Sequence, residues 1–284
     1  MIKAIEFPNK TFSTKEDLFS ELKKNENRLI DLKKSNVYKS HEKGQFSFLN
    51  ADKLFTTEKS LIAAKDGFIY PIISTTNYMD SHKDVHFNGS MTKTAKEQNG
   101  KVVYALDHEL KYDSILAWQK DVNMFIATIG WDLVGKNYNG TTEALVFEIN
   151  KDAITRKDVL KSIENKVSEF QNSIRMVYYK VVLGLNSSAK ENATNKQYYD
   201  ARINDIVNKE IAEEEGYFWG VEELGIHKEG SLVVAGGSND ATSIYSKNIE
   251  AVDNTSSPKN EPLQDTQVKQ KINYNYVLIN LKTK

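Results

Sequence analysis

The stretch from Ser173 to Leu185 constrains the fold more than any other part of the sequence. It is rich in β-branched residues and tyrosine, which favour an extended strand over a helix. The residues before it, 151–170, have helical spacing instead, with one apolar face formed by Val159, Ile163, Val167 and Phe170. A helix that leads into a long strand predicts an α+β fold with a β-rich core.

Shorter strands are expected on both sides of this run. The candidate segments are 68–74, 101–106, 123–131, 143–149, 217–221 and 231–235. Pro71 is predicted to mark an edge or a bulge, because proline cannot donate to a strand ladder. Gly140 is predicted to mark the turn between two of these strands. Residues 192–215 are a second helical stretch, and Gly216 is its expected end.

Residues 1–60 are predicted to be an N-terminal strand–helix appendage. Residues 3–7 alternate weakly, as a short strand would. Ser13 and Glu16 have the spacing of a capping box at the start of a helix. That helix is expected to pack on the main domain or on a partner. Its single apolar face consists of Leu18, Leu22, Leu29 and Leu32.

The main domain is predicted to span residues 61–245. Residues 246–284 are polar throughout and resemble a disordered C-terminal tail. The exception is residues 274–281, an apolar segment near the end of the tail that suits docking to a partner. No internal repeat is visible in the sequence, so the expected organisation is one domain with two appendages.

The composition excludes several classes of function. The chain has 284 residues and no cysteine, which rules out disulfides, thiolate metal sites and a cysteine nucleophile. Its formal net charge of −1 gives no global attraction to nucleic acid or to an anionic membrane. No apolar run approaches the roughly 20 residues that span a bilayer, and the N-terminus lacks the apolar core of a signal peptide. We therefore expect a cytoplasmic protein without a nucleic-acid or membrane partner.

Three short stretches, far apart in the chain, carry the residue types of a serine hydrolase. His108 follows the candidate strand 101–106, Ser173 begins the long strand, and Glu229 precedes the last candidate strand. A serine hydroxyl is a poor nucleophile at neutral pH unless an imidazole accepts its proton. The imidazole in turn needs a third group that fixes its tautomer and orientation. The sequence predicts Ser173 as nucleophile, His108 as general base and Glu229 as the third member.

Each of these assignments has alternatives. Ser173 suits a cap or turn, His108 a surface loop, and Glu229 an exposed strand position, which are the plainer interpretations of such residues. His82 and His86 are the alternative bases. The alternative acids are Glu222, Glu223 and Asp107.

Three further charged residues lie close to these stretches in the sequence. Asp80 and Asp84 form only a weak calcium or magnesium signal, so a structural role in a turn is favoured and neither a metal nor a cofactor is predicted. Arg175 lies two residues after Ser173 and therefore on the same face of a strand. It is expected to support the oxyanion region, to bind an acidic substrate group, or to form a surface salt bridge.

These residues also carry a resemblance to a known family. The segment Asp80–Ser90, DSHKDVHFNGS, is similar to the Asp-x-x-Gly-Asp-Val element of the caudoviral prohead proteases. In that family a strand ending in a catalytic His follows, then a helix and a nucleophilic Ser in Ser-Ile-Gly. A Leu-x-Glu-x-Ser-x-Val element and a Gly-Ser-Asn turn come last. The matching residues here are Val102–His108, Ser173-Ile174-Arg175, residues 228–234 and Gly237-Ser238-Asn239.

The resemblance covers about residues 62–245 and departs from the family pattern at three positions. Lys83 stands where Gly is usual, Arg175 stands after Ser-Ile in place of Gly, and His227 stands where Leu is common. The resemblance implies an assemblin-like fold, a small β-barrel wrapped by helices. It also implies a capsid maturation serine endopeptidase that cleaves scaffold and the capsid-protein propeptide. Such an enzyme would act within the assembling prohead in the host cytoplasm. The sequence leaves a homo-oligomer open as one oligomeric state.

Two other functions are weighed against this one. The departures at Lys83 and Arg175 are also compatible with a catalytically inert capsid assembly or scaffold protein that retains the protease fold. A small-molecule serine esterase is less well supported. Its usual nucleophile elbow, Gly-x-Ser-x-Gly, is absent around Ser173.

Overall fold

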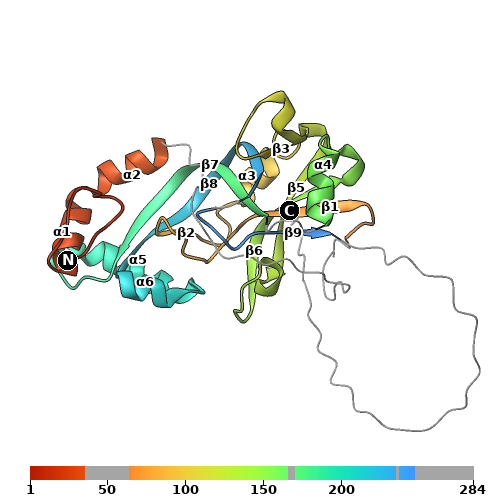
Figure 1. Ribbon diagram of the computed structural model, residues 1–284. Helices are drawn as coiled ribbons and strands as arrows, with labels where there is room; N and C mark the ends of the chain where they lie inside the picture. The colour runs from red at the N-terminus through yellow and green to blue at the C-terminus, as the bar shows by residue number, and fades with distance from the viewer. Residues whose placement is uncertain (36–63, 166–169, 235–236, 247–284) are drawn as a thin grey trace, which may run out of the picture.

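The computed structural model describes residues 1–35, 64–165, 170–234 and 237–246 (Figure 1). These residues form a mixed α+β fold, as the sequence predicts. The α-helices are α1 (Lys15–Lys24), α2 (Glu26–Ser35), α3 (Thr92–Glu97), α4 (Lys157–Glu164), α5 (Ala193–Arg202) and α6 (Lys209–Glu215). The strands are β1 (Phe68–Thr75), β2 (Asp84–His86), β3 (Val103–Leu106), β4 (Ile115–Ala117), β5 (Val122–Gly130), β6 (Thr141–Asn150), β7 (Gln171–Leu185), β8 (Tyr217–Val233) and β9 (Ser243–Ser246). The predicted docking segment 274–281 lies outside the described residues.

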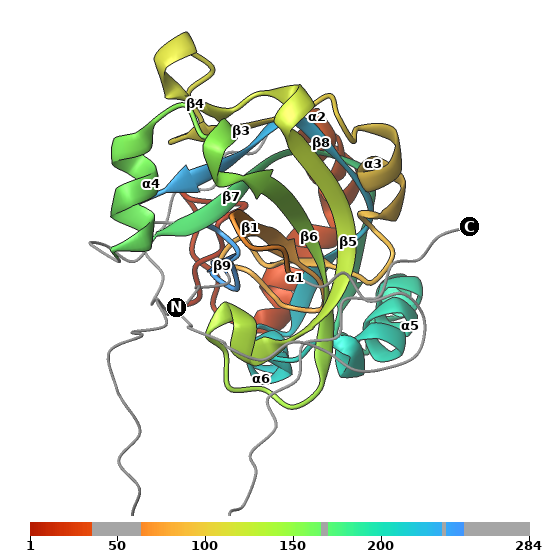
Figure 2. The same cartoon turned by 90° about the vertical axis from the view of Figure 1, so that its right-hand side faces the viewer.

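The described strands form two open sheets (Figure 2). One sheet is antiparallel, with the order β5-β6-β1-β9. In the other, β2 and β3 pair in parallel with one side of β8, β7 pairs antiparallel with its other side, and β4 pairs with β3. The expected barrel is thus not closed by hydrogen bonds among the described strands. Since β1 carries β6 on one edge and β9 on the other, it has no edge left to join β7.

The strand β8 differs most from the sequence prediction. The segments 217–221 and 231–235 are predicted as separate strands, but the structure joins them in one strand of 17 residues. The charged residues between them obscured this continuity. Glu222, Glu223 and Lys228 lie on its less buried positions, while Leu224 and Ile226 are buried. Lys228 has a φ of 70°, and the pairing with β7 shifts register at this point. A bulge of this kind re-aims the side chain beside it, and the next residue is the fully buried Glu229.

Most other predicted strands of the main domain are confirmed with adjusted ends, and several predictions are corrected. Pro71 lies in a central strand rather than at an edge, and the bulge falls just after it, between Ile72 and Ser74. Of the predicted helix 151–170, the described residues form a 3-10 turn (Lys151–Ala153) and α4. Residues 192–215 form α5 and α6, separated by a short 3-10 turn. Gly216 ends α6 with a left-handed φ of 78°, as expected.

The N-terminal residues pack on the main core. The capping box is formed by Thr14 and Asp17, one residue later than predicted, and Asn25 separates α1 from α2. Residues 3–7 form no strand; Ile2 instead makes an isolated bridge to Phe12. Leucines of both helices join the same hydrophobic cluster as the strands of the two sheets, and α2 and α5 lie against β7 (Figure 1). The predicted appendage therefore shares the hydrophobic core of the rest of the chain, up to the end of α2.

The two sheets lie close together at Gly230 of β8. A Cβ atom at this position would lie 2.9 Å from the ring of Phe147 on β6 and 3.1 Å from the Cδ1 atom of Ile73 on β1. At such distances any added side chain would displace Phe147 or Ile73, so glycine favours this contact. Gly230 separates Glu229 from Ser231, and the contact fixes the position of both within the interior.

Candidate active site

Three strands bring the candidate catalytic residues together. Ser173 of β7 pairs directly with Ser231 of β8, so their side chains lie on one face of the sheet. Glu229 precedes Ser231 by two residues and shares that face. The strand β3 runs parallel beside this part of β8, with Leu106 next to Leu232. His108, two residues beyond Leu106, is thereby placed over the same face.

The three predicted residues form a continuous relay of hydrogen bonds. His108 Nε2 lies 2.7 Å from Ser173 Oγ, and His108 Nδ1 lies 2.8 Å from Glu229 Oε1. The exposed fractions are 2% for His108, 3% for Ser173 and 0% for Glu229. A proton on Nδ1 donated to the carboxylate leaves Nε2 free to accept the serine proton. This arrangement has the geometry of a nucleophile, a base and an orienting acid.

The backbone at His108 is held in an unusual conformation. Asp107 and His108 have left-handed φ values of 50° and 58°, which cost a residue other than glycine about 1–2 kcal/mol each. The N–H of His108 donates to Ser231 Oγ at 3.2 Å, and its carbonyl accepts from Arg175 Nη2 at 2.6 Å. The N–H of Asp107 donates to the carbonyl of Leu232 at 2.9 Å. These contacts stabilise the strained turn and fix the position of the imidazole.

Two further side chains satisfy the buried carboxylate of Glu229. Arg175 Nε lies 2.9 Å from Oε1, as an ion pair rather than as an aligned hydrogen bond. The hydroxyl of Ser231 donates to Oε2. A buried carboxylate without such partners would be strongly disfavoured. Arg175, with a side chain only 13% exposed, therefore belongs to the interior of the site and does not form the surface salt bridge that was one of its predicted roles.

Replacing Glu229 by Gln is expected to lower the rate of hydrolysis on the order of 10²–10⁴-fold. A neutral amide does not stabilise the imidazolium that forms at His108, and it leaves Arg175 without its anion. The measurement is kcat/KM for a peptide or ester substrate. Glu223→Gln is the matched control, because this acid pairs with Lys93 at the surface and should change the rate less than about twofold. An equal loss in both variants would contradict the assignment of Glu229.

The alternative acids and bases have other partners. Glu222 binds Arg202 and also accepts from Tyr198, and Asp107 has an exposed side chain. His86 is buried on β2 and lies 3.2 Å from the hydroxyl of Tyr178. His82 lies in the turn before β2, where its N–H donates to Asp80. The structure thus brings together the three residues of the primary prediction and places these alternatives in other contacts.

The carboxylate of Asp80 organises the turn before β2. Its Oδ1 accepts the N–H groups of His82 at 2.8 Å and Asp84 at 2.9 Å. Lys83, between them, has a left-handed φ of 61°. Burial and the neighbouring Asp84 charge raise the pKa of Asp80 to about 6. No group of three or more His, Cys, Asp or Glu residues suited to a metal ion occurs in the part of the chain that the structure describes.

A buried polar chain continues from Asp84 into the molecule. Lys33 of α2 pairs with one oxygen of Asp84, and the hydroxyl of Tyr178 donates to the other at 2.9 Å. Since Tyr178 gives its proton to Asp84, His86 Nε2 must donate to Tyr178. Burial lowers the pKa of His86 to about 4 and so favours the neutral imidazole. In that form His86 Nδ1 accepts from Ser74 at 3.4 Å.

The buried His86 is expected to make the protein less stable in acid. Its pKa is about 4 in the folded chain and ~6.5 in the unfolded chain. Between these values the unfolded chain binds more protons, so stability falls as pH drops, by about 3 kcal/mol over the window. The pKa of Asp80 is raised in the folded chain, so over part of this pH range Asp80 increases stability as the pH drops. The comparison of wild type with His86→Gln isolates the histidine.

Urea unfolding at pH 7 and at pH 4 measures this effect. The wild type should lose stability relative to His86→Gln between the two pH values, because the variant has no imidazole to protonate. Asp84 and Lys33, whose charges act on His86, and Asp80 are present in both proteins, so their contributions largely cancel. A difference between the two proteins that does not change with pH would show that His86 is not held neutral.

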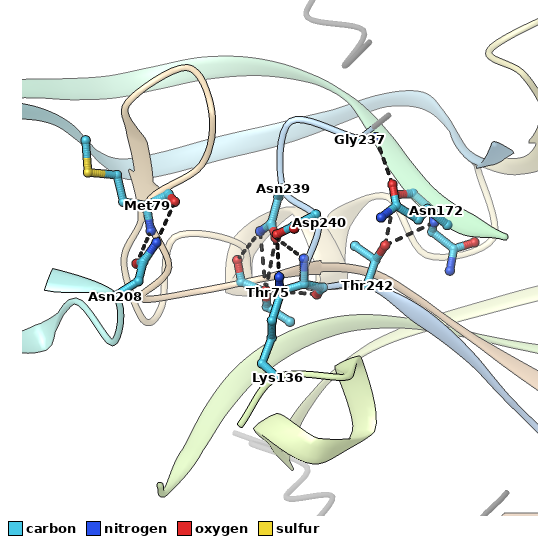
Figure 3. A network of polar contacts seen from close by, with 11 residues as sticks. Thr75, Met79, Lys136, Asn172, Asn208, Gly237, Asn239, Asp240 and Thr242 are labelled. Carbon is cyan, nitrogen blue, oxygen red and sulfur yellow. Dashed lines mark hydrogen bonds and ion pairs between the residues drawn. The ribbon is translucent and has the colours of Figure 1, made fainter. Parts of the chain in front are cut away.

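Asn172, the residue before the nucleophile, was not singled out by the sequence and proves to anchor β7. Its Oδ1 accepts from the hydroxyl of Tyr104 at 2.8 Å, and its Nδ2 donates to the carbonyls of Ile72 and Ser243 at 3.2 and 2.7 Å. Its N–H donates to Thr242 Oγ1 at 3.1 Å (Figure 3). The only signal in the sequence was a polar residue at the start of an apolar strand. These bonds tie the beginning of β7 to the first sheet.

The Gly-Ser-Asn turn lies beside this anchor. Asn239 Nδ2 donates to the carbonyl of Thr75 at 3.1 Å, and Asn239 Oδ1 accepts the N–H of Ala241 at 2.9 Å (Figure 3). The N–H of Gly237 donates to Gln171 Oε1 at 3.1 Å. The turn predicted to close the domain therefore contacts the strand that carries Ser173.

Comparison of the chain with protein families, with curated proteins and with solved structures finds no match. None of the helices in the described residues is long and apolar enough to cross a membrane.

Proposed function

We propose that the protein is a serine endopeptidase of the prohead protease type, with Ser173 as nucleophile, His108 as general base and Glu229 as the orienting acid. The observation that carries the proposal is the relay from Glu229 through His108 to Ser173, with contacts of 2.8 and 2.7 Å. Ser173 lies 65 positions after His108 in the sequence, and Glu229 lies 121 positions after it. Chance rarely places three residues of these types, so far apart in the chain, in the correct order and within hydrogen-bond distance.

The proposed reaction has two steps. Ser173 Oγ attacks the scissile carbonyl while its proton passes to His108 Nε2, and the imidazolium then protonates the leaving amine. Water attacks the resulting acyl-enzyme, with His108 as base, and the acid product leaves. Glu229 stabilises the imidazolium in both steps. Arg175 and Ser231 act on the carboxylate and on the His108 backbone, so they are positioning residues.

The departures from the family pattern fit this reading. Lys83 stands where the resembling family has Gly, and its backbone adopts a left-handed φ of 61°, a conformation that favours glycine. Arg175 replaces a Gly and provides the cation beside Glu229. The two substitutions that favoured an inert scaffold protein therefore leave the relay intact. We propose an assemblin-like arrangement in which the two open sheets take the place of a closed barrel.

The substrate class follows from the resemblance. We propose that the enzyme cleaves scaffold polypeptide and the capsid-protein propeptide, within the assembling prohead in the host cytoplasm, and that it self-associates. Co-expression with the cognate capsid protein, followed by intact-mass analysis, tests this. Cleavage by wild type and its loss in Ser173→Ala would support the proposal. Absence of cleavage by wild type, with both proteins folded and assembled, would favour the inert scaffold protein instead.

A further inference from the structure

Gln171 has a buried amide nitrogen without a hydrogen-bond partner among the described residues. The residue is 2% exposed, and its Oε1 accepts the N–H of Gly237 at 3.1 Å. A buried donor left unsatisfied costs about 1–3 kcal/mol, and most buried polar atoms avoid this cost. An unsatisfied donor that persists beside a reactive group points to a ligand that would complete it.

Gln171 lies on the same face of β7 as Ser173. Gln171, Asn172 and Ser173 pair in unbroken register with Val233, Leu232 and Ser231 of β8. Alternate residues of a regular strand point to the same side, and their Cα atoms are about 7 Å apart. A glutamine side chain spans most of that distance. Because Gly237 binds the amide oxygen, the NH₂ group is the end of the side chain that remains to meet a substrate.

The other long donor near Ser173 on this strand is already engaged. Arg175 pairs with Glu229 through Nε and donates to the carbonyl of His108 through Nη2. Using it for an oxyanion would remove the cation from a carboxylate that is 0% exposed. Gln171 therefore supplies the donor at lower cost, since its Nε2 has no hydrogen bond to give up among the described residues.

We propose that Gln171 Nε2 donates a hydrogen bond to the carbonyl oxygen of the scissile bond and to the oxyanion that develops there. This inference rests on the proposed function. When the Ser173 Oγ–carbon bond forms, the carbonyl π electrons move to the oxygen and the hydroxyl proton moves to His108 Nε2. The new negative charge on that oxygen is what the amide stabilises. One such donor contributes on the order of 10²–10³-fold to kcat.

Two variants of the full chain separate donation from a merely structural role. Gln171→Glu retains the acceptor for Gly237 but has no N–H at neutral pH, and Gln171→Met removes both functions without adding charge. The probes are p-nitrophenyl acetate and its thiono analogue, in which sulfur, a weak acceptor, replaces the carbonyl oxygen. Gln197→Glu, on the exposed side of α5, is the control for the added charge.

Both Gln171 variants are expected to hydrolyse the oxygen ester about 10²–10³-fold more slowly than wild type. On the thiono ester their loss of rate relative to wild type should be smaller than about tenfold. Equal losses on the two esters would overturn the donor role, because a displaced strand affects both alike. Full activity of Gln171→Met would overturn it as well. If wild type shows no hydrolysis that depends on Ser173, the proposed function itself fails and the donor role falls with it.

Discussion

Replacing Ser173 by Ala is expected to lower kcat/KM on the order of 10⁴–10⁶-fold, the largest effect on activity in this protein. The hydroxyl is the group that becomes covalently bonded to the substrate. Neither His108 nor Glu229 can replace it as nucleophile in the variant. The fold should be kept, since the change removes a single oxygen atom from a side chain that is 3% exposed. We expect the free energy of unfolding to change by less than about 1–2 kcal/mol.

The matched control is Ser162→Ala. Ser162 lies on α4, where its hydroxyl donates to the carbonyl of Asp158 at 2.9 Å, and its replacement should leave the activity within about twofold of wild type. Turnover and urea unfolding are measured on the same preparations. If Ser173→Ala kept a tenth of the wild-type activity, the nucleophile would have to be a different residue.

Replacing Lys33 by Met is expected to destabilise the folded chain by about 3–5 kcal/mol, the largest effect on stability. The side chain of Asp84 is 1% exposed, and that of Lys33 is 10% exposed. Removing the ammonium leaves the Asp84 charge buried, with Tyr178 as its neutral hydrogen-bond donor. Lys33 Nζ also lies 5.3 Å from the ring centroid of Trp219, so the loss includes a cation–π contact.

Lys10→Met is the control for this experiment. Lys10 pairs with Glu21, but its side chain is 54% exposed, so its loss should cost less than about 1 kcal/mol. Adding Asp84→Asn to Lys33→Met should recover much of the lost stability, because the buried charge is then removed. A midpoint of urea unfolding for Lys33→Met that matches the control would show that this pair does not hold α2 on the strands.

The helices and strands with a clear periodicity of apolar residues were predictable from the sequence, and so were the positions of the three candidate catalytic residues. Ser173 stands where a helical pattern changes to a strand pattern, and His108 stands at the end of an apolar strand, so both positions are marked by local patterns. Glu229 was chosen over Glu222 and Glu223 from the motif alone. The continuity of β8 through these charged residues was not predictable, because it depends on strands β2, β3 and β7 that pair with it from distant parts of the chain.

The side chains that hold the relay in place were mostly invisible in the sequence. The ion pair of Arg175 with Glu229 and the anchoring of Asn172 join residues on different strands, and no local spacing records such contacts. The burial of Lys33 was hidden for the same reason. A lysine in a polar helix is ordinarily exposed, and only the packing of α2 on β7 brings it to Asp84.

The most direct test of the relay is reaction of the native protein with a fluorophosphonate, followed by intact-mass measurement and peptide mapping. A phosphonylated product requires an activated serine, and the reagent is independent of any peptide specificity. We predict a single adduct per chain, located at Ser173, absent from His108→Ala and from urea-unfolded wild type. An unmodified wild-type chain, or an adduct on a serine other than Ser173, would contradict the account.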